Sequence, residues 1–144
     1  MWKEMMLLAV AGGAGTLARY GTVSLFEHCF GRFLPWGTIA VNLIGCLLFG
    51  LIWSLAEERT VISPQSRFLL LTGFMGAFTT FSTFAFETGW YLEHSEWSLA
   101  ALNLLGQLLG GIILVFVGRS MARSVLLILA GAVALVGLLV WRFV

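Results

Sequence analysis

Charge is scarce in this sequence of 144 residues. Only 10% of the residues are Asp, Glu, Lys or Arg, aspartate is absent, and 60% of the residues are hydrophobic. A globular domain carries about 25% charged residues, and a short chain exposes much of its surface, so this composition excludes an ordinary soluble domain. The mean hydropathy of +0.98 indicates that the lipid bilayer is the solvent. Eight Lys or Arg residues against seven Glu residues provide no basic surface for nucleic acid.

Side chains for catalysis or for a transition metal are also few. Cys29 and Cys46 form no CxxC motif, so no zinc site or disulfide is expected from them. The two histidines, His28 and His94, fall in predicted loops and cannot be joined with a nucleophile and an orienting group. We therefore do not expect an enzyme.

Long apolar runs fill most of the chain. A helix needs about 20 apolar residues to cross the hydrocarbon core, and five runs of about this length lie between charged segments, at residues 5–26, 36–56, 68–91, 97–118 and 125–141. A loop with Glu27, His28 and Arg32 separates the first two runs, and a short basic link, 119–123, precedes the last. We expect one all-α membrane domain: four core transmembrane helices in 1–118 and an additional hydrophobic helix in 119–144.

The basic residues near the run ends predict the orientation. If all five runs span the membrane, five basic residues lie on one side, namely Lys3, Arg59, Arg67, Arg119 and Arg123. Two lie on the other side, Arg32 and Arg142. This bias favours an internal N-terminus. Without the fifth run and its flanks the count is three against one, which is weak enough for either orientation to insert.

Polar residues inside the predicted spans are the candidate functional residues, because each one needs a partner or a wet path. Arg19 either extends to the interface or holds an anion near a pore mouth. Asn42 either joins two helices or offers its NH2 group to a passing anion. Asn103 and Gln107 are four residues apart and share one helix face, which we expect to point into the bundle.

The third run has an unusual centre, Gly73-Phe74-Met75-Gly76-Ala77-Phe78-Thr79-Thr80-Phe81-Ser82-Thr83-Phe84. Glycines followed by a β-branched pair disfavour an uninterrupted helix, so we expect a break at membrane depth, where freed carbonyls must be buried or line a cavity. Hydroxyl and amide donors can replace the water shell of an anion, and aromatic edges carry positive partial charge. The run therefore indicates a path for a small, dehydrated anion.

These motifs resemble the bacterial fluoride channels called Fluc or CrcB. Three segments carry the resemblance: Gly12-Gly13 to Arg19-Tyr20, Gly37 to Gly50 around Val41-Asn42, and Gly73-Phe74-Met75-Gly76 leading into Thr79-Thr80-Phe81-Ser82-Thr83-Phe84. The resemblance covers roughly residues 7–118.

The resemblance implies a four-helix subunit in the bacterial inner membrane that pairs with a copy of itself as an antiparallel, dual-topology homodimer with two fluoride pores. Such channels let cytoplasmic fluoride leave passively. Phe81 and Phe84 match the pore phenylalanines, Asn42 the pore asparagine and Arg19 the first-helix arginine, and Ser82 and Thr83 belong to the hydroxyl track. A structural sodium ion at the dimer interface would be held by the backbone carbonyls of Gly76 and Thr79.

Two features depart from the family pattern. Gly111 stands where a serine is expected in the fourth helix, and Gln107, one turn earlier, is the candidate substitute donor. The fifth hydrophobic run is additional to the four-helix pattern, and it produces the bias of basic residues that opposes dual topology.

Two other functions are alternatives. A small proton-coupled exporter needs a carboxylate inside the membrane, whereas the glutamates are expected in termini and loops, with Glu87 near the end of the third span. A membrane scaffold subunit that transports nothing would leave Asn42 and the serine and threonine cluster without a purpose.

Overall fold

The computed structural model describes residues 1–31, 33–57 and 62–143, and every regular element in these ranges is a helix. The elements are α1 (Trp2–Phe30), α2 (Trp36–Glu57), α3 (Pro64–Phe68), the π-helix η1 (Leu69–Met75), α4 (Gly76–Phe78), α5 (Phe81–Glu93) and α6 (Trp97–Phe143). The predicted all-α class is confirmed. Arg32 and Arg59, which enter the orientation count, lie outside the described residues.

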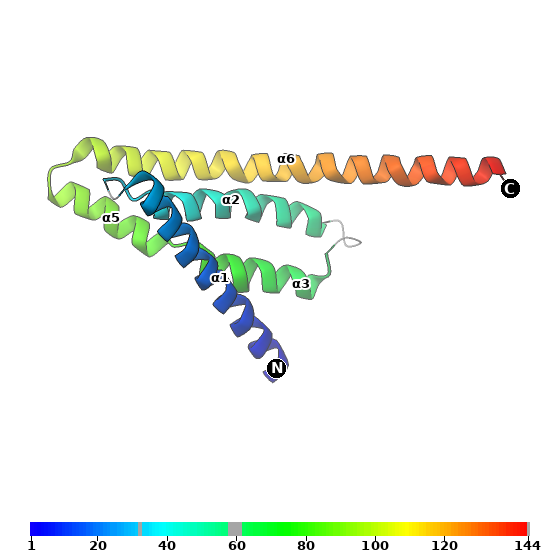
Figure 1. Cartoon of the computed structure of the whole chain (residues 1–144), viewed down its shortest axis with the longest axis horizontal. Coiled ribbons are helices and arrows are strands. Elements are labelled where there is room, and N and C mark those ends of the chain that lie inside the picture. The colour runs from blue at the N-terminus through cyan, green and yellow to red at the C-terminus, as the bar shows by residue number, and fades with distance from the viewer. Residues whose placement is uncertain (32, 58–61, 144) are drawn as a thin grey trace.

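Helices α2 and α6 lie side by side, and α1 crosses the bundle obliquely against η1 and α4 (Figure 1). Glycine permits the close approach of α2 and α6. A β-carbon on Gly50 would collide with the carbonyl oxygen of Val115, and one on Gly118 would collide with the carbonyl oxygen of Leu47. Small residues at such contacts let membrane helices pack backbone against backbone.

The predicted break in the third run is present. Helix α4 ends at Phe78, and Thr79 (φ −89°, ψ 160°) and Thr80 (φ −147°, ψ 109°) are extended. Helix α5 then starts with Thr80 as its N-cap, whose hydroxyl oxygen accepts from the Thr83 N–H at 3.3 Å. The break therefore consists of two residues between two helical segments.

The predicted separation of the last two apolar runs is wrong, because residues 119–123 continue the helix. Helix α6 has 47 residues and is about 70 Å long at about 1.5 Å per residue. The segment contains neither proline nor glycine, Ala122 is fully buried, and Arg119 forms an ion pair with Glu57 at 3.9 Å. The C-terminal part of α6 extends past the other helices (Figure 1).

The first predicted loop is also shorter than expected. Glu27, His28 and Cys29 lie in the last turn of α1, which continues to Phe30. The helix ends at Gly31, whose φ of 75° is a conformation that glycine adopts without strain.

Among the residues that the structure describes, three helical stretches are long and apolar enough to cross a membrane: Trp36–Glu57, Pro64–Glu93 and Trp97–Ala132. Five were expected. Helix α1 has the length, with 29 residues, but its glycines, hydroxyls and Arg19 keep it outside this group. The fourth and fifth runs have merged into α6.

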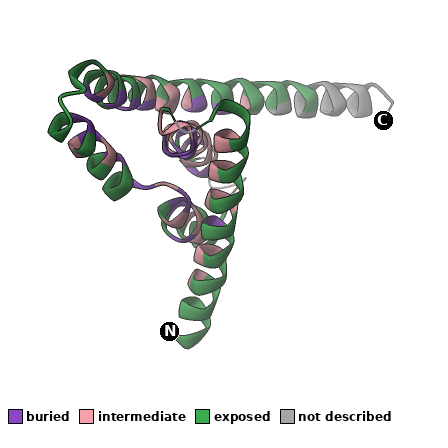
Figure 2. Ribbon diagram, turned by 60° about the vertical axis from the view of Figure 1, so that its left-hand side comes forward, coloured by how far each residue is buried: buried purple, intermediate pink, exposed green. Residues whose placement is uncertain are grey.

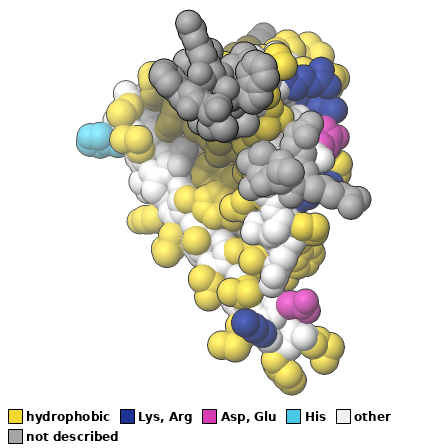
Figure 3. Space-filling model, turned by 90° about the vertical axis from the view of Figure 1, so that its right-hand side faces the viewer, with side chains coloured by type: hydrophobic (Ala, Val, Ile, Leu, Met, Phe, Trp, Pro, Cys, Tyr) yellow, Lys and Arg dark blue, Asp and Glu magenta, His cyan; other side chains and the backbone are white. Residues whose placement is uncertain are grey.

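The buried core is small and lies on the inward faces of the helices (Figure 2). It is formed by Val41, Leu71, Met75 and Phe78. Many large hydrophobic side chains are exposed instead, and hydrophobic groups are spread over the described surface seen in Figure 3. An apolar exterior of this extent suits lipid or a second protein surface.

Candidate functional site

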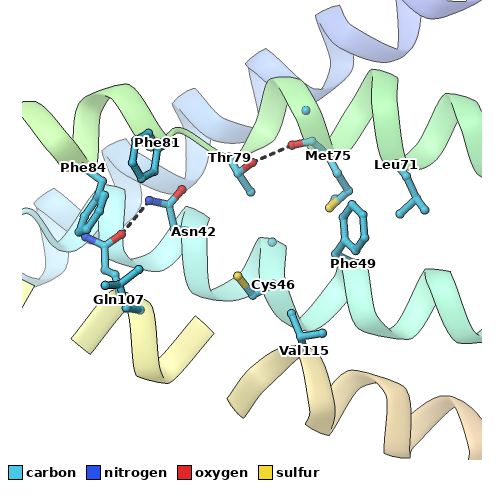
Figure 4. A pocket seen from close by; sticks show the side chains of 13 residues that line it. Asn42, Cys46, Phe49, Leu71, Met75, Thr79, Phe81, Phe84, Gln107 and Val115 are labelled. Carbon is cyan, nitrogen blue, oxygen red and sulfur yellow. Dashed lines mark hydrogen bonds between the residues drawn. The ribbon is translucent and has the colours of Figure 1, made fainter. Parts of the chain in front are cut away.

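A cavity of about 350 Å³ lies beside the break in the third run (Figure 4). Its walls include Asn42 from α2, Thr79 from the break, Phe81 and Phe84 from α5, and Gln107 from α6. None of the described residues that line it is charged. With Gly76, which also lines it, the fold thus brings together six of the predicted site residues around one uncharged space.

Asn42 holds the break in place through both groups of its amide. Its Nδ2 donates to the Thr80 carbonyl oxygen at 3.0 Å, and its Oδ1 accepts from the Thr80 N–H at 2.8 Å. The second Nδ2 hydrogen bond goes to Gln107 Oε1 at 2.7 Å. A primary amide has two N–H donors, so both donors of Asn42 are engaged within the protein.

Arg19 binds the backbone at the N-terminal side of the break, where α4 ends. Its guanidinium donates to the carbonyl oxygens of Ala77, Phe78 (3.1 Å) and Thr79 (3.0 Å). These carbonyls lie at the C-terminal end of a helical segment, where partners are missing and a positive charge is favourable. Arg19 therefore caps α4 and does not extend to the interface in this structure.

A chain of side-chain hydrogen bonds continues from Asn42 across α6 to α5. Gln107 Nε2 donates to Asn103 Oδ1 at 2.8 Å, Asn103 Nδ2 donates to Thr88 Oγ1 at 2.9 Å, and Thr88 Oγ1 donates to the Phe84 carbonyl oxygen at 2.8 Å. Asn103 and Gln107 are 1% and 8% exposed, which confirms the prediction that their face points into the bundle. The relay fixes α6 against both sides of the cavity.

Phe81 and Phe84 form an aromatic pair at the cavity. Their ring centroids are 5.7 Å apart and the rings are inclined by 54°. Phe84 is 6% exposed, whereas Phe81 is 76% exposed. One ring is therefore packed inside the chain, and the other stands open at its surface.

Three hydroxyl groups cluster beside this pair. Thr80 Oγ1 lies 2.9 Å from Thr83 Oγ1 and 3.4 Å from Ser82 Oγ. Ser82 and Thr83 are exposed, whereas Thr80 is 9% exposed. Sequence reasoning did not single out Thr80, although a threonine three residues before Thr83 at a predicted helix start is a recognisable capping pattern.

Gly76 and Thr79, predicted as carbonyl ligands of sodium, both line the cavity. The helical donor for the Gly76 carbonyl would be the Thr80 N–H, which donates to Asn42 instead. The Thr79 carbonyl accepts from Arg19 and keeps one lone pair. The Gly76 carbonyl therefore fits a cation better than the Thr79 carbonyl does.

Glu87 lies in α5, near the end of the third span as predicted, and is half-buried. Its Oε1 accepts from Thr38 Oγ1 at 2.6 Å, and its Oε2 is buried without a hydrogen-bond partner among the described residues. A carboxylate is therefore present within the helical bundle. The sequence did not predict the contact with Thr38, because nothing local indicates that α2 covers this part of α5.

Comparisons with known proteins agree with this architecture. The family described as "CrcB-like protein, Camphor Resistance (CrcB)" matches residues 6–119. A "Fluoride-specific ion channel FluC" from Nitrosococcus oceani is 51% identical over 125 residues, which cover 87% of this chain and 100% of that protein. Proteins of the same name from Solidesulfovibrio magneticus and Chlorobaculum tepidum are 46% and 43% identical, over 87% and 84% of this chain and 100% and 95% of theirs. With this match over more than half of its length, the chain belongs to the CrcB family.

Proposed function

We propose that this chain forms a fluoride-selective channel through which cytoplasmic fluoride leaves the cell passively. The observation that carries the proposal is the uncharged cavity at the helix break, with Phe81 and Phe84 in its wall. The curated relatives, each named a fluoride-specific ion channel, support fluoride as the ion. We place the channel in the bacterial inner membrane as a multi-pass protein.

The donors around the cavity suit a small anion that must lose its water. Ser82 and Thr83 present hydroxyl groups at the surface beside the rings, and hydroxyl donors can replace part of a hydration shell. Gln107 Nε2 has a second hydrogen beyond the one given to Asn103. Aromatic edges add positive partial charge without a fixed cation. Because no lysine or arginine is among the described lining residues, a dehydrated anion is held weakly and leaves quickly.

A second copy of the chain completes the proposed channel. Phe81, at 76% exposed, leaves an aromatic ring uncovered next to the cavity. We propose an antiparallel homodimer in the bilayer, with two pores that each use such rings. The two orientations are checked by labelling an introduced cysteine from each side of the membrane.

Sodium is the proposed structural ion at the dimer interface. Hard cations prefer oxygen ligands, and the Gly76 carbonyl, with the remaining lone pair of Thr79, offers two per chain. Two antiparallel copies would supply four. Reconstitution with N-methyl-D-glucamine in place of sodium should lower fluoride flux, and added sodium should restore it. Full flux without sodium would contradict this part of the proposal.

Fluoride efflux from liposomes tests the function directly. Liposomes loaded with potassium fluoride are treated with valinomycin, and a fluoride electrode records the release. A matched set is loaded with potassium chloride. Fast fluoride release with little chloride release is expected. No fluoride release from folded, dimeric protein would refute the proposal and favour a scaffold subunit that transports nothing.

A further inference from the structure

A second cavity, of about 410 Å³, adjoins the first at one end of the bundle. It is lined by Phe49, Trp53, Arg67, Phe68 and Thr72, together with Pro64 and Leu71. Phe49 and Leu71 also line the cavity at the helix break. We call the second cavity, which contains Arg67, the outer cavity, and the first, which is lined by no charged residue among those described, the inner cavity.

The flat face of the Arg67 guanidinium stacks on the Trp53 ring in this outer cavity. Its guanidinium carbon lies 3.8 Å from the centroid of the Trp53 ring. The indole is itself fixed, because its Nε1–H donates to Glu57 Oε1 at 2.9 Å and its ring stacks on Phe49 at 6.1 Å and 13°. A guanidinium has its N–H donors in its plane, so stacking orients Arg67 and leaves the edge of its plane open to a ligand.

The surrounding charges favour an anion. Glu57, the neighbouring carboxylate, is engaged with Trp53 and with Arg119 at 3.9 Å. Arg123 follows one helical turn after Arg119 on α6. Among the described residues at the adjoining ends of α2, α3 and the middle of α6, three arginines therefore stand against one glutamate.

Two carboxylates lie at the opposite end of the bundle. Glu93 ends α5, and Glu96 precedes α6. The three arginines would therefore attract an anion to the end with Arg67. In the proposed antiparallel dimer this end faces the cytoplasm in one of the two copies.

We propose that Arg67, mounted on Trp53, forms an outer binding site for fluoride or another small monovalent anion, from which the ion passes Phe49 into the cavity at Phe81 and Phe84. This inference rests on the proposed channel function. A fixed charge at the mouth raises the local anion concentration, while the uncharged inner cavity avoids trapping the ion. Separate sites for capture at Arg67 and for conduction in the uncharged inner cavity explain how the channel collects its ion at low concentration.

The test compares Arg67→Gln with Arg123→Gln. Both variants remove one positive charge from the same end, but Arg123 lines neither cavity. Fluoride efflux is measured over a series of fluoride concentrations up to saturation. A unit charge at roughly 7 Å, with an effective dielectric constant of about 40 to 80, changes the local anion concentration about three- to sevenfold. For Arg67→Gln we therefore expect fluoride flux to fall about three- to sevenfold at low fluoride and to be near normal at saturation. For Arg123→Gln we expect little change in flux.

Two further measurements separate capture from a structural role. Arg67→Lys keeps the charge and should restore most of the flux at low fluoride. Potassium gluconate at about 1 M, where the screening length is about 3 Å, should remove the difference between the wild type and Arg67→Gln.

The possible failures are distinguishable. Equal flux in Arg67→Gln and Arg123→Gln would overturn the outer site, as would a loss that persists at saturating fluoride or at high salt. In each of these cases a conducting wild-type protein leaves the channel function intact. If the wild type releases no fluoride, the proposed function fails, and the outer site fails with it.

Discussion

Replacing Asn42 by aspartate should destabilise the helix break and stop conduction. The substitution removes the Nδ2 donor to the Thr80 carbonyl (3.0 Å) and to Gln107 Oε1 (2.7 Å), while the acceptor for the Thr80 N–H (2.8 Å) remains. Each lost hydrogen bond is worth about 0.5–1.5 kcal/mol, and an acceptor left without a donor costs about 1–3 kcal/mol. The new carboxylate also places a negative charge beside the anion path.

Part of this cost is recoverable because the amide relay can reverse its direction. Gln107 can rotate its amide to donate to the new carboxylate, Asn103 can then donate to Gln107, and Thr88 to Asn103, with loss of the Thr88 bond to the Phe84 carbonyl (2.8 Å). The Thr80 carbonyl belongs to the backbone and has no such adjustment. The net loss in free energy of unfolding should therefore be about 2–4 kcal/mol.

Denaturant unfolding in detergent micelles, followed by tryptophan fluorescence, measures the stability of Asn42→Asp, and fluoride efflux from liposomes measures its flux. Cys46→Ala is the matched stability control, because Cys46 lies one turn further along α2 in the same cavity wall and should cost about 1 kcal/mol or less. If Asn42→Asp unfolds like this control and conducts like the wild type, Asn42 does not clamp the break.

Four other substitutions or deletions test separate parts of the reasoning. Phe81→Ile should keep the fold and lower fluoride flux about tenfold, since an aromatic edge contact is worth up to about 1.5 kcal/mol; unchanged electrode traces would remove the ring from the path. Arg19→Gln should lower the free energy of unfolding by about 1.5–3 kcal/mol, because hydrogen bonds from a charged group are lost at three carbonyls, and denaturant titration checks this. Glu87→Gln should retain voltage-driven fluoride flux, whereas a proton-coupled exporter would lose its response to a pH gradient. Removal of residues 124–144 should preserve the dimer in light scattering and the flux in liposomes, and loss of the dimer would place that segment in the core assembly.

Local signals in the sequence predicted the features that depend on neighbouring residues. The glycines at 73 and 76 and the threonine pair that follows predicted the break, because its cause is local backbone preference. The inward face of Asn103 and Gln107 followed from their spacing alone. The end of α1 was misplaced because charged residues such as Glu27 do not end a helix, whereas Gly31 does.

Contacts between distant segments were not predictable from one sequence. Arg19 meets carbonyls 58 to 60 residues away, and Glu87 meets Thr38 across 49 residues. The continuity of α6 was missed for a different reason. A basic segment marks where a helix leaves the hydrocarbon, but Arg119, Met121, Ala122 and Arg123 are all good helix formers, so the boundary of the membrane and the end of the helix do not coincide.

The hydrogen-bond geometry also divides the polar residues into two functional groups. The strongest donors near the cavity, Arg19 and the Asn42 amide, donate their hydrogen bonds within the protein and hold the extended Thr79–Thr80 segment. The groups left to meet an ion are weaker: the hydroxyls of Ser82 and Thr83, and the open ring of Phe81. A strong cationic donor at this depth would bind fluoride tightly and slow its release, because charge-assisted hydrogen bonds are about twice as strong as neutral ones. Using the charged group for architecture and the neutral groups for the ion is therefore what rapid, passive conduction requires.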